Sequence, residues 1–367
     1  SGVYLPVEAI ENSGVGENWL AEAQEIAYKF QENHTVEVQQ EFFDKMAEFL
    51  QGLVDNGKIY KGFTSQSYTY PGFSGNLGWL VVGDRYTDSF TVHNGNETDL
   101  AKNFYKTMAE YYDKGYIRQD VASVDNGSED WCRGWSDPVS DQCYINYSHN
   151  GFTDDLSKEM AGWTKPLYAM HCQPHCWTSL GQATGTSIPF TAKEPERAMM
   201  FMNWLVTKDE KAIEFYNLYS YGIEGKHYEW NEAHTDIKVF GGDGQADSSF
   251  DWGQRPWMMG TLLNAYSCAV YPAPYYEELI KLQEDAYTSP LLGFNFDYSD
   301  VETEYNLLSS IGKEYGSMLD CGYLGAAGVE AKEQEYRDKM YAAGLQDVID
   351  AIQEQVTAFV EKNERTW

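Results

Sequence analysis

The chain has 367 residues, a length that allows a large buried core without disulfides or metals and favours two lobes over one. Its 57 Asp and Glu residues outnumber its 26 Lys and Arg residues, and the formal net charge is −31. A surface field of this sign repels nucleic-acid phosphates and anionic lipid head groups, so both are excluded as expected partners, and neutral or cationic small molecules are favoured.

The chain opens with a predicted buried strand at residues 3–7, a polar loop at 8–14 and an amphipathic helix that begins near Glu17. Residues 35–39 alternate like a second strand, so the opening is typical of a parallel α/β sheet. Ligands of such sheets bind beyond the carboxyl ends of the strands. Glu11 in the first loop is therefore a candidate to accept hydrogen bonds from sugar hydroxyls, with a solvated loop acid as the alternative.

A second helix is predicted at residues 41–55, and a strand follows at 58–63. The next stretch, 64–79, has neither helical nor strand periodicity and contains Tyr68 and Tyr70. Aromatic rings in loops are candidates for a ligand cleft, so both tyrosines are candidate stacking residues.

A helix is predicted at residues 99–116, and the polar loop that follows it contains Trp131. The strand predicted at 143–147 leads to His149, and an ordinary capping histidine is one reading of this residue. A further strand is predicted at 167–170.

Residues 171–176 read His-Cys-Gln-Pro-His-Cys and bring four possible soft-metal ligands into a short turn. No second pair with the spacing CxxC or HxxxH occurs in the sequence, so a local disulfide, free thiols or a cleft loop is favoured over a metal site. No metal and no other cofactor is predicted.

The second half of the chain continues the alternation of helices and strands. The predicted elements are a buried strand at 186–190, a helix opened by Pro195, helices at 209–219 and 252–268, an extended segment at 289–296 and a closing amphipathic helix from Leu345.

Aromatic side chains make up 15% of the sequence, so some rings are expected at surfaces or clefts rather than in the core. A flat ring packs on the C–H face of a pyranose, while Tyr hydroxyls and Trp N–H groups bond its edge. Further stacking candidates, each with core packing as the alternative, are Trp131, Trp177, Trp252 and Trp257.

Taken together, this layout resembles the extracellular solute-binding proteins of ABC importers, the class that includes maltose-binding protein. Tyr4–Pro6 and Asn18–Glu22 are similar to the first strand and helix of that class, and Pro195–Met199 resembles the helix after its hinge. One departure is that the class normally carries several dozen more residues after Gln39, which complete the sheet of the first lobe.

A narrower resemblance is to lipoprotein sugar binders of anaerobic Gram-positive bacteria. The runs Tyr221–Tyr228 and Ser289–Phe294 are similar to signature runs of that subfamily, and Ala342–Gly344 opens its usual last helix.

The resemblance implies an α/β fold of two lobes joined by hinge-crossing strands, with the first lobe shortened. Lobe 1 is expected to comprise residues 1–40 and 186–285, and lobe 2 residues 41–185 and 286–367. Closure of the hinge would capture a neutral carbohydrate, an oligosaccharide, for delivery to the permease subunits. The expected ligand-binding residues are Glu11, Tyr68, Tyr70, Trp131, His149, Trp177, Trp252 and Trp257.

The resemblance also implies an extracellular monomer, attached to the outer face of the cytoplasmic membrane only through a lipid anchor outside this chain. Two other classes stay open at this point: a secreted glycoside hydrolase and a carbohydrate-binding surface module. A hydrolase needs two carboxylates facing each other across a cleft, and 57 acids supply candidates without identifying a pair. No nucleophile elbow, phosphate loop or zinc-protease motif occurs, so no catalytic residue and no enzyme activity are predicted.

Overall fold

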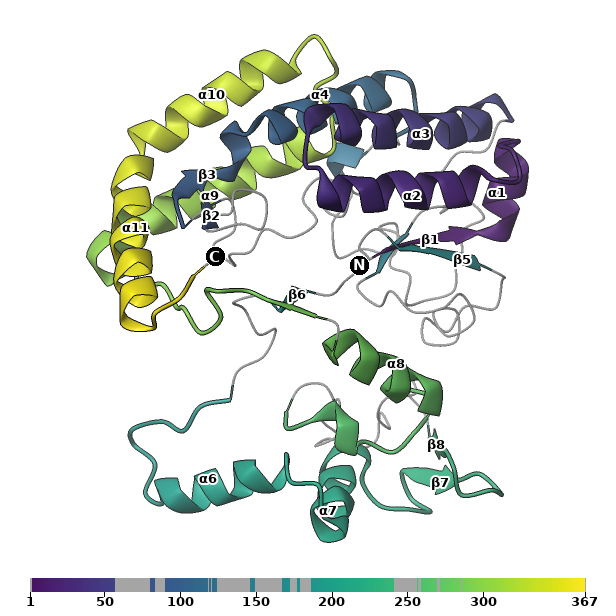
Figure 1. The fold of residues 1–367 in the computed structure, drawn as a ribbon, viewed down its shortest axis with the longest axis vertical. Coiled ribbons are helices and arrows are strands. Elements are labelled where there is room, and N and C mark those ends of the chain that lie inside the picture. The colour runs from purple at the N-terminus through teal and green to yellow at the C-terminus, as the bar shows by residue number, and fades with distance from the viewer. Residues whose placement is uncertain are drawn as a thin grey trace. The chain divides into compact units, whose positions relative to one another are not determined.

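The structure is a computed structural model, and the parts of the chain it describes are residues 2–56, 80–82, 90–117, 119, 121–123, 146–148, 167–171, 177–178, 186–240, 256, 259–268, 271–284 and 286–366. The chain divides into two compact units (Figure 1). Unit 1 comprises residues 1–154, 163–181 and 285–367, and unit 2 comprises residues 155–162 and 182–284.

Strand β1 (Gly2–Pro6) forms where a strand was predicted and runs directly into helix α1 (Val7–Ser13). The loop predicted at residues 8–14 is therefore wrong for most of its length. Ala9 and Ser13 of α1 are buried and lie four residues apart, which is the spacing of one helix face. The polar residues of this segment made it look like a loop when it was judged by composition.

Helix α2 (Trp19–Glu32) confirms the predicted amphipathic helix and buries Trp19 and Phe30. The next helix, α3 (Val36–Asp55), begins earlier than predicted and replaces the strand expected at residues 35–39. Thr35 is its N-cap, and the hydroxyl oxygen of Thr35 accepts a hydrogen bond from the Val38 N–H at 3.4 Å. A capped first turn can thus carry the same short alternation as a strand.

Helix α1 packs closely against α3. A Cβ added to Gly52 of α3 would lie 1.8 Å from the Ser13 carbonyl oxygen, so only glycine permits this approach.

Unit 1 contains four more described helices, and one of them, α9, contacts the other three (Figure 1). They are α4 (Asp99–Asp113), α9 (Glu302–Asp320), α10 (Val329–Ala342) and α11 (Leu345–Lys362). The predicted helix at 99–116 and the predicted closing helix are both confirmed. Short 3-10 turns lie at η2 (Gly95–Glu97), η3 (Val121–Ser123) and η5 (Ser299–Val301).

The sheets of unit 1 are small in the described residues. Strand β1 lies between β4 (Asn146–Ser148) and β5 (Leu167–His171) and is antiparallel to both. The opening is therefore not the parallel strand-helix-strand unit that was predicted, although the strand at 167–170 is confirmed. The other pairs are β2 (Leu80–Val82) with β3 (Val92–Asn94), antiparallel, and β6 (Trp177–Thr178) with β9 (Tyr287–Thr288), parallel.

Unit 2 is built around α7 and a β-hairpin. Its elements are α6 (Pro195–Trp204), α7 (Glu210–Tyr221), β7 (Tyr228–Trp230), β8 (Ile237–Val239), η4 (Leu262–Asn264) and α8 (Ala273–Glu284). Helices α6 and α7 confirm the two helices predicted there. The buried side chains of this unit include Leu205, Ala212, Tyr216, Tyr221 and Ile237.

Three predictions in this half of the chain are wrong. Residues 186–190 form no strand, and the Phe190 side chain is 100% exposed. Residues 259–268 contain only the 3-10 turn η4 where a helix was expected, because Gly260 there has φ +78° and packs against Leu205. Residues 290–293 form a turn, so the extended segment predicted at 289–296 is interrupted.

The division into units differs from the predicted lobes at residues 1–40. These residues belong to unit 1 and not with residues 186–285, because β1 pairs with β4 and β5 and because α1 and α2 pack on α3. Among the described helices, none has both the length and the apolar character needed to cross a membrane.

Candidate functional site

Of the eight predicted ligand-binding residues, Glu11 is the one whose side chain is described. It lies on α1 and is exposed, so it is a helix residue rather than the loop residue that was expected. Trp177 lies in β6, where the backbone alone is described. The other six, which fall outside the described residues, are Tyr68, Tyr70, Trp131, His149, Trp252 and Trp257. The set as a whole stays a prediction.

The run His-Cys-Gln-Pro-His-Cys at 171–176, for which a local disulfide, free thiols or a cleft loop was favoured over a metal site, lies outside the described residues except for His171 in β5. Within the described part of the chain, no three His, Cys, Asp or Glu side chains are placed to hold a metal ion.

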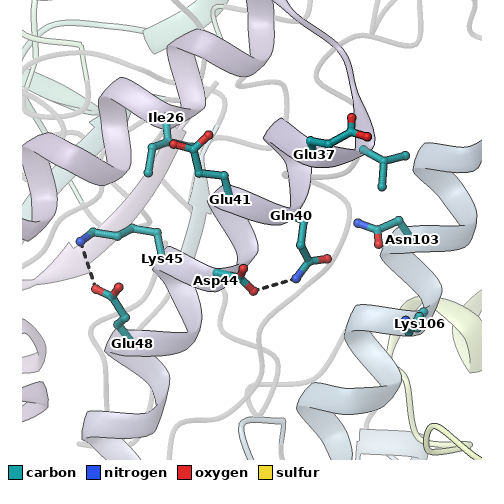
Figure 2. A pocket seen from close by; sticks show the side chains of 10 residues that line it. Ile26, Glu37, Gln40, Glu41, Asp44, Lys45, Glu48, Asn103 and Lys106 are labelled. Atoms are coloured by element: carbon teal, nitrogen blue, oxygen red, sulfur yellow. Dashed lines mark hydrogen bonds and ion pairs between the residues drawn. The ribbon is translucent and has the colours of Figure 1, made fainter.

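A groove of about 690 Å³ lies on the surface of unit 1, along α2, α3 and α4 (Figure 2). Its lining residues are mostly polar and come chiefly from α3, whose carboxylates stand along it. The labelled side chains are Ile26, Glu37, Gln40, Glu41, Asp44, Lys45, Glu48, Asn103 and Lys106.

The cations of this groove are already paired with carboxylates. The Lys45 ammonium lies 2.6 Å from a Glu22 oxygen and 3.0 Å from a Glu48 oxygen. Burial acts to lower the pKa of Lys45, but the hydrogen bonds to Glu22 and Glu48 outweigh burial and raise the pKa. The ammonium of Lys106, the other cation among the described lining residues, lies 3.9 Å from a Glu110 oxygen. None of the described residues that line the groove is aromatic, so this part of the chain supplies no stacking surface for a pyranose there.

Unit 2 offers a different kind of surface, a cluster of rings around β7. The Trp230 and Tyr266 ring centroids are 4.7 Å apart, and the Tyr228 and Tyr266 centroids are 6.3 Å apart. His234, in the hairpin turn, places its ring 5.8 Å from Trp230. Tyr228 is buried, Trp230 and Tyr266 are half-buried, and His234 is exposed, so the cluster presents rings at the surface. We call Trp230, Tyr266 and His234 the β7 ring cluster.

Carboxylates stand near the β7 ring cluster. Burial raises the pKa of Tyr266, and the negative charges of Glu214 and Glu224 raise it further. Both glutamates are exposed. Rings beside solvated carboxylates combine a stacking face with hydrogen-bond acceptors, which is what a sugar with hydroxyls on its edge requires.

The loop before β7 fixes the position of the ring cluster. Gly222 and Gly225 have φ values of +86° and +74°, which allow a tight turn. The buried His227 accepts the Ile223 N–H on Nδ1 at 2.8 Å, and the Gly225 N–H donates to the Tyr228 carbonyl at 2.7 Å. The rings are thus held by backbone bonds on both sides of the turn.

Sequence reasoning missed the β7 ring cluster. The available signal was the alternation Tyr228-Glu229-Trp230, which places two rings on one face of a strand. Their contact with Tyr266 depends on a pairing between distant segments that no local pattern encodes.

Comparison with known proteins finds one family model, one curated relative and several solved structures that are similar to the chain. A domain of unknown function, DUF3502, matches residues 290–361, a range that includes most of the run Ser289–Phe294 and all of Ala342–Gly344. A carbohydrate ABC transporter substrate-binding protein of Streptococcus pneumoniae serotype 4 is 24% identical over 307 residues, which are 83% of this chain and 58% of that protein. The chain therefore spans less than two thirds of the length of this curated relative.

The N-glycan transport solute binding protein NgtS from Streptococcus pneumoniae matches 99% of this chain and 73% of its own, with a TM-score of 0.66 and 19% identity. Its complex with Man5GlcNAc matches 98% of this chain and 72% of its own, with a TM-score of 0.63 and 19% identity. Its complex with Man1GlcNAc matches 98% of this chain and 73% of its own, with a TM-score of 0.61 and 17% identity. The predicted resemblance is confirmed at the level of architecture: the chain has the α/β fold of transport solute-binding proteins.

Proposed function

We propose that the chain is the substrate-binding component of an ABC importer, which captures a neutral oligosaccharide and delivers it to permease subunits. The observation that carries the proposal is the fold shared with NgtS over 99% of the chain, since NgtS has been solved with Man1GlcNAc and Man5GlcNAc bound. The net charge of −31 favours an uncharged ligand for the same reason that it disfavours phosphates.

The proposal is a binding function and not a catalytic one. The curated relative and NgtS are described as substrate-binding or solute-binding proteins, which supports capture without turnover. A secreted glycoside hydrolase is the alternative. Whether the bound sugar is returned intact or cleaved distinguishes the two functions.

The proposed ligand-binding residues are the eight named from the sequence, together with two rings from the β7 ring cluster. Trp230 and Tyr266 are added because their half-buried rings contact each other, and because the negative charges of Glu214 and Glu224 act on Tyr266. The proposal includes an extracellular lipoprotein that acts as a monomer, as the resemblance implies.

The experiment is a thermal-shift screen with neutral oligosaccharides, Man5GlcNAc among them. At a ligand concentration of 100 Kd, binding to the native state adds about 2.7 kcal/mol to the free energy of unfolding and raises Tm by several degrees. Chromatography of the sugar after incubation should return it unchanged. Cleaved sugar would support the hydrolase, and the absence of any shift across the panel would contradict the proposal.

Hinge closure is tested with a sugar that raises Tm. Small-angle scattering should give a smaller radius of gyration with the sugar than without it. Replacing Tyr68 or Tyr70 by Ala should weaken binding and leave Tm of the free protein nearly unchanged, whereas a large loss of Tm would identify them as core residues.

A further inference from the structure

A run of aromatic residues leads from the core of unit 1 to its surface. Residues 294–298 read Phe-Asn-Phe-Asp-Tyr, so rings and polar side chains alternate along them. Phe294 and Phe296 are each 7% exposed and belong to the hydrophobic core of the unit, whereas Tyr298 is 43% exposed. The third ring of the run is therefore the one that reaches solvent.

The Tyr298 ring lies on other rings rather than standing alone. Its centroid is 4.9 Å from that of Tyr305 in α9, and the two ring planes are 15° apart, which is a stacked arrangement. The Phe296 ring lies 6.5 Å from Tyr298 and 6.1 Å from Tyr305. Tyr305 covers one face of the Tyr298 ring, and the exposed part of Tyr298 therefore includes the other face. We call Phe296, Tyr298 and Tyr305 the Tyr298 platform.

Hydrogen bonds from α11 fix the backbone of the Tyr298 platform. The Gln355 side chain accepts the Asp297 N–H at 2.9 Å and donates to the Asp297 carbonyl at 2.7 Å. On the other side of the ring, the Val301 N–H donates to the Tyr298 carbonyl at 3.0 Å. A ring that is already held in place loses little conformational entropy when a ligand packs on it, which favours binding.

The residue before Tyr298 supplies a hydrogen-bond acceptor. The Oδ1 atom of Asp297 accepts the Ser299 N–H at 3.0 Å and also the Ser299 hydroxyl. These two bonds lower the pKa of Asp297, so its carboxyl is ionised at neutral pH. Because both bonds use Oδ1, the Oδ2 atom can accept a hydrogen bond from a ligand. An open ring face within one residue of such an acceptor suits a pyranose, which has an apolar C–H face and hydroxyls on its edge.

We propose that the Tyr298 platform is a stacking site for a neutral pyranose, with Asp297 accepting hydrogen bonds from the hydroxyls of the sugar. The platform lies within residues 290–361, the range matched by DUF3502, so the proposal gives part of that domain a role in carbohydrate contact. None of the ligand-binding residues proposed above belongs to the platform, which makes it an additional site on unit 1. The choice of a sugar as the ligand rests on the proposed function.

The test is a titration of the 367-residue chain, labelled with carbon-13 in its tyrosine rings and followed by NMR. The probes are methyl α-D-mannopyranoside and methyl β-D-glucopyranoside. The Tyr298 ring signals are identified by their absence from the spectrum of Tyr298→Leu. They should shift and saturate with a Kd on the order of 10 mM, because contact with one ring is weak.

Tyr341 is the matched control, since it is also 43% exposed and its hydroxyl is held by a hydrogen bond to Glu97 at 2.9 Å. Its ring signals should stay in place throughout the titration. Tyr298 signals that do not move with either glycoside would overturn the proposal. Equal shifts of Tyr298 and Tyr341 would overturn it too, because the sugar would then be contacting exposed rings without selection.

Substitutions separate stacking on a ligand from packing on the protein. The Tyr305 signals report binding in variants that lack the Tyr298 ring. Tyr298→Phe keeps a flat ring and should bind the glycosides with a Kd within about two-fold of the parent value, whereas Tyr298→Leu should raise the Kd at least about ten-fold. Tyr341→Leu should leave the Kd unchanged. A Tyr298→Leu protein whose Tyr305 signals respond as in the parent would mean that Tyr298 serves only to cover Tyr305, and the proposal would fail.

The outcome can be told apart from that of the proposed function. The thermal-shift screen reports capture of an oligosaccharide, and the glycoside titration reports the Tyr298 platform directly. A rise in Tm in the screen without a shift of the Tyr298 signals would leave the proposed function in place and overturn the platform. Shifts of the Tyr298 signals without any rise in Tm across the panel would support the platform and contradict the importer function.

Discussion

Gly222 shows how one residue fixes the turn that carries the β7 ring cluster. Its φ is +86°, and a Cβ added there would lie 2.4 Å from the Nδ1 atom of His227, the atom that accepts the Ile223 N–H. Two penalties therefore coincide at this position, backbone strain and the displacement of a buried hydrogen-bond acceptor.

Gly222→Ala is expected to lower the free energy of unfolding of unit 2 by about 1–3 kcal/mol. The measurement is the urea midpoint followed by tryptophan fluorescence. The matched control is Gly316→Ala in α9, where an added Cβ meets no atom within 4 Å and the φ is not positive. This control should stabilise the protein by about 0.5–1 kcal/mol, because alanine is the better helix former. Equal effects of the two substitutions would contradict the account of the turn.

Asp320 is a carboxylate at the end of α9 whose burial raises its pKa to about 7. The folded state therefore binds a proton that the unfolded chain, with an ordinary pKa near 3.8, releases. The stability contributed by this proton is fully present below about pH 4 and is lost as pH rises through about 7.

Asp320→Asn should remove this part of the pH dependence, because an amide stays neutral at every pH. The difference in free energy of unfolding between variant and parent should grow from pH 4 to pH 8, by up to about 4 kcal/mol in favour of the variant. Urea titrations at pH 4, 6 and 8 measure it. Asp300→Asn, which removes one carboxylate at an exposed position, is the control for the loss of a negative charge. A difference for Asp320→Asn that stays constant from pH 4 to pH 8 would mean that the Asp320 carboxyl is solvated.

At the scale of the element, α3 organises the first unit. The fully buried Phe43 side chain lies against the rings of Phe104 and Tyr111, and the Tyr111 hydroxyl donates to the Phe43 carbonyl at 2.5 Å. Phe43→Ala leaves the backbone carbonyl in place but opens a cavity between α3 and α4, so it should lower the free energy of unfolding by about 3–5 kcal/mol. Glu48→Ala, an exposed position on the same helix, should change it by less than about 0.5 kcal/mol in the same denaturation assay. A loss below 1 kcal/mol for Phe43→Ala would contradict this packing.

The elements that could be predicted from the sequence are those whose pattern persists over several turns. Helices α2, α4 and α11 repeat their apolar positions for 14 to 18 residues, and this length leaves no competing periodicity. Predictions for short segments failed for a physical reason. Residues 35–39 alternate like a strand, yet they begin a helix, because Thr35 caps it and because Val38 and Phe42 lie on its buried face.

The candidate site was less predictable than the fold. Composition indicates that rings should reach the surface, but it does not indicate which rings meet. Trp230 contacts Tyr266 because the Ile237 N–H of the hairpin bonds the Ser267 carbonyl, and this pairing between distant segments is set by tertiary structure. The same limit applies to residues 186–190, whose strand-like pattern describes a preference that is fulfilled only when a neighbouring strand is present.

At the scale of the whole molecule, each unit has buried side chains of its own. The hydrophobic core that includes Leu5, Leu50 and Ile352 consists of residues of unit 1, while Leu205, Tyr216 and Tyr221 are buried within unit 2. Separate cores allow separate cooperative transitions, so equilibrium unfolding should depart from a two-state curve.

Leu50→Ala and Leu205→Ala form a matched pair to test this expectation, because both leucines are 0% exposed and lie in different units. Each substitution should lower the free energy of unfolding of its own unit by about 2–5 kcal/mol and move one transition while the other stays in place. The circular dichroism signal comes mainly from the helices of unit 1, whereas tryptophan fluorescence also reports Trp204 and Trp230 of unit 2. The two signals should therefore give different unfolding midpoints in the urea titration. If both variants instead shift one common transition by the same amount, the two cores unfold together, and the two units would then be one cooperative structure despite their separate buried side chains.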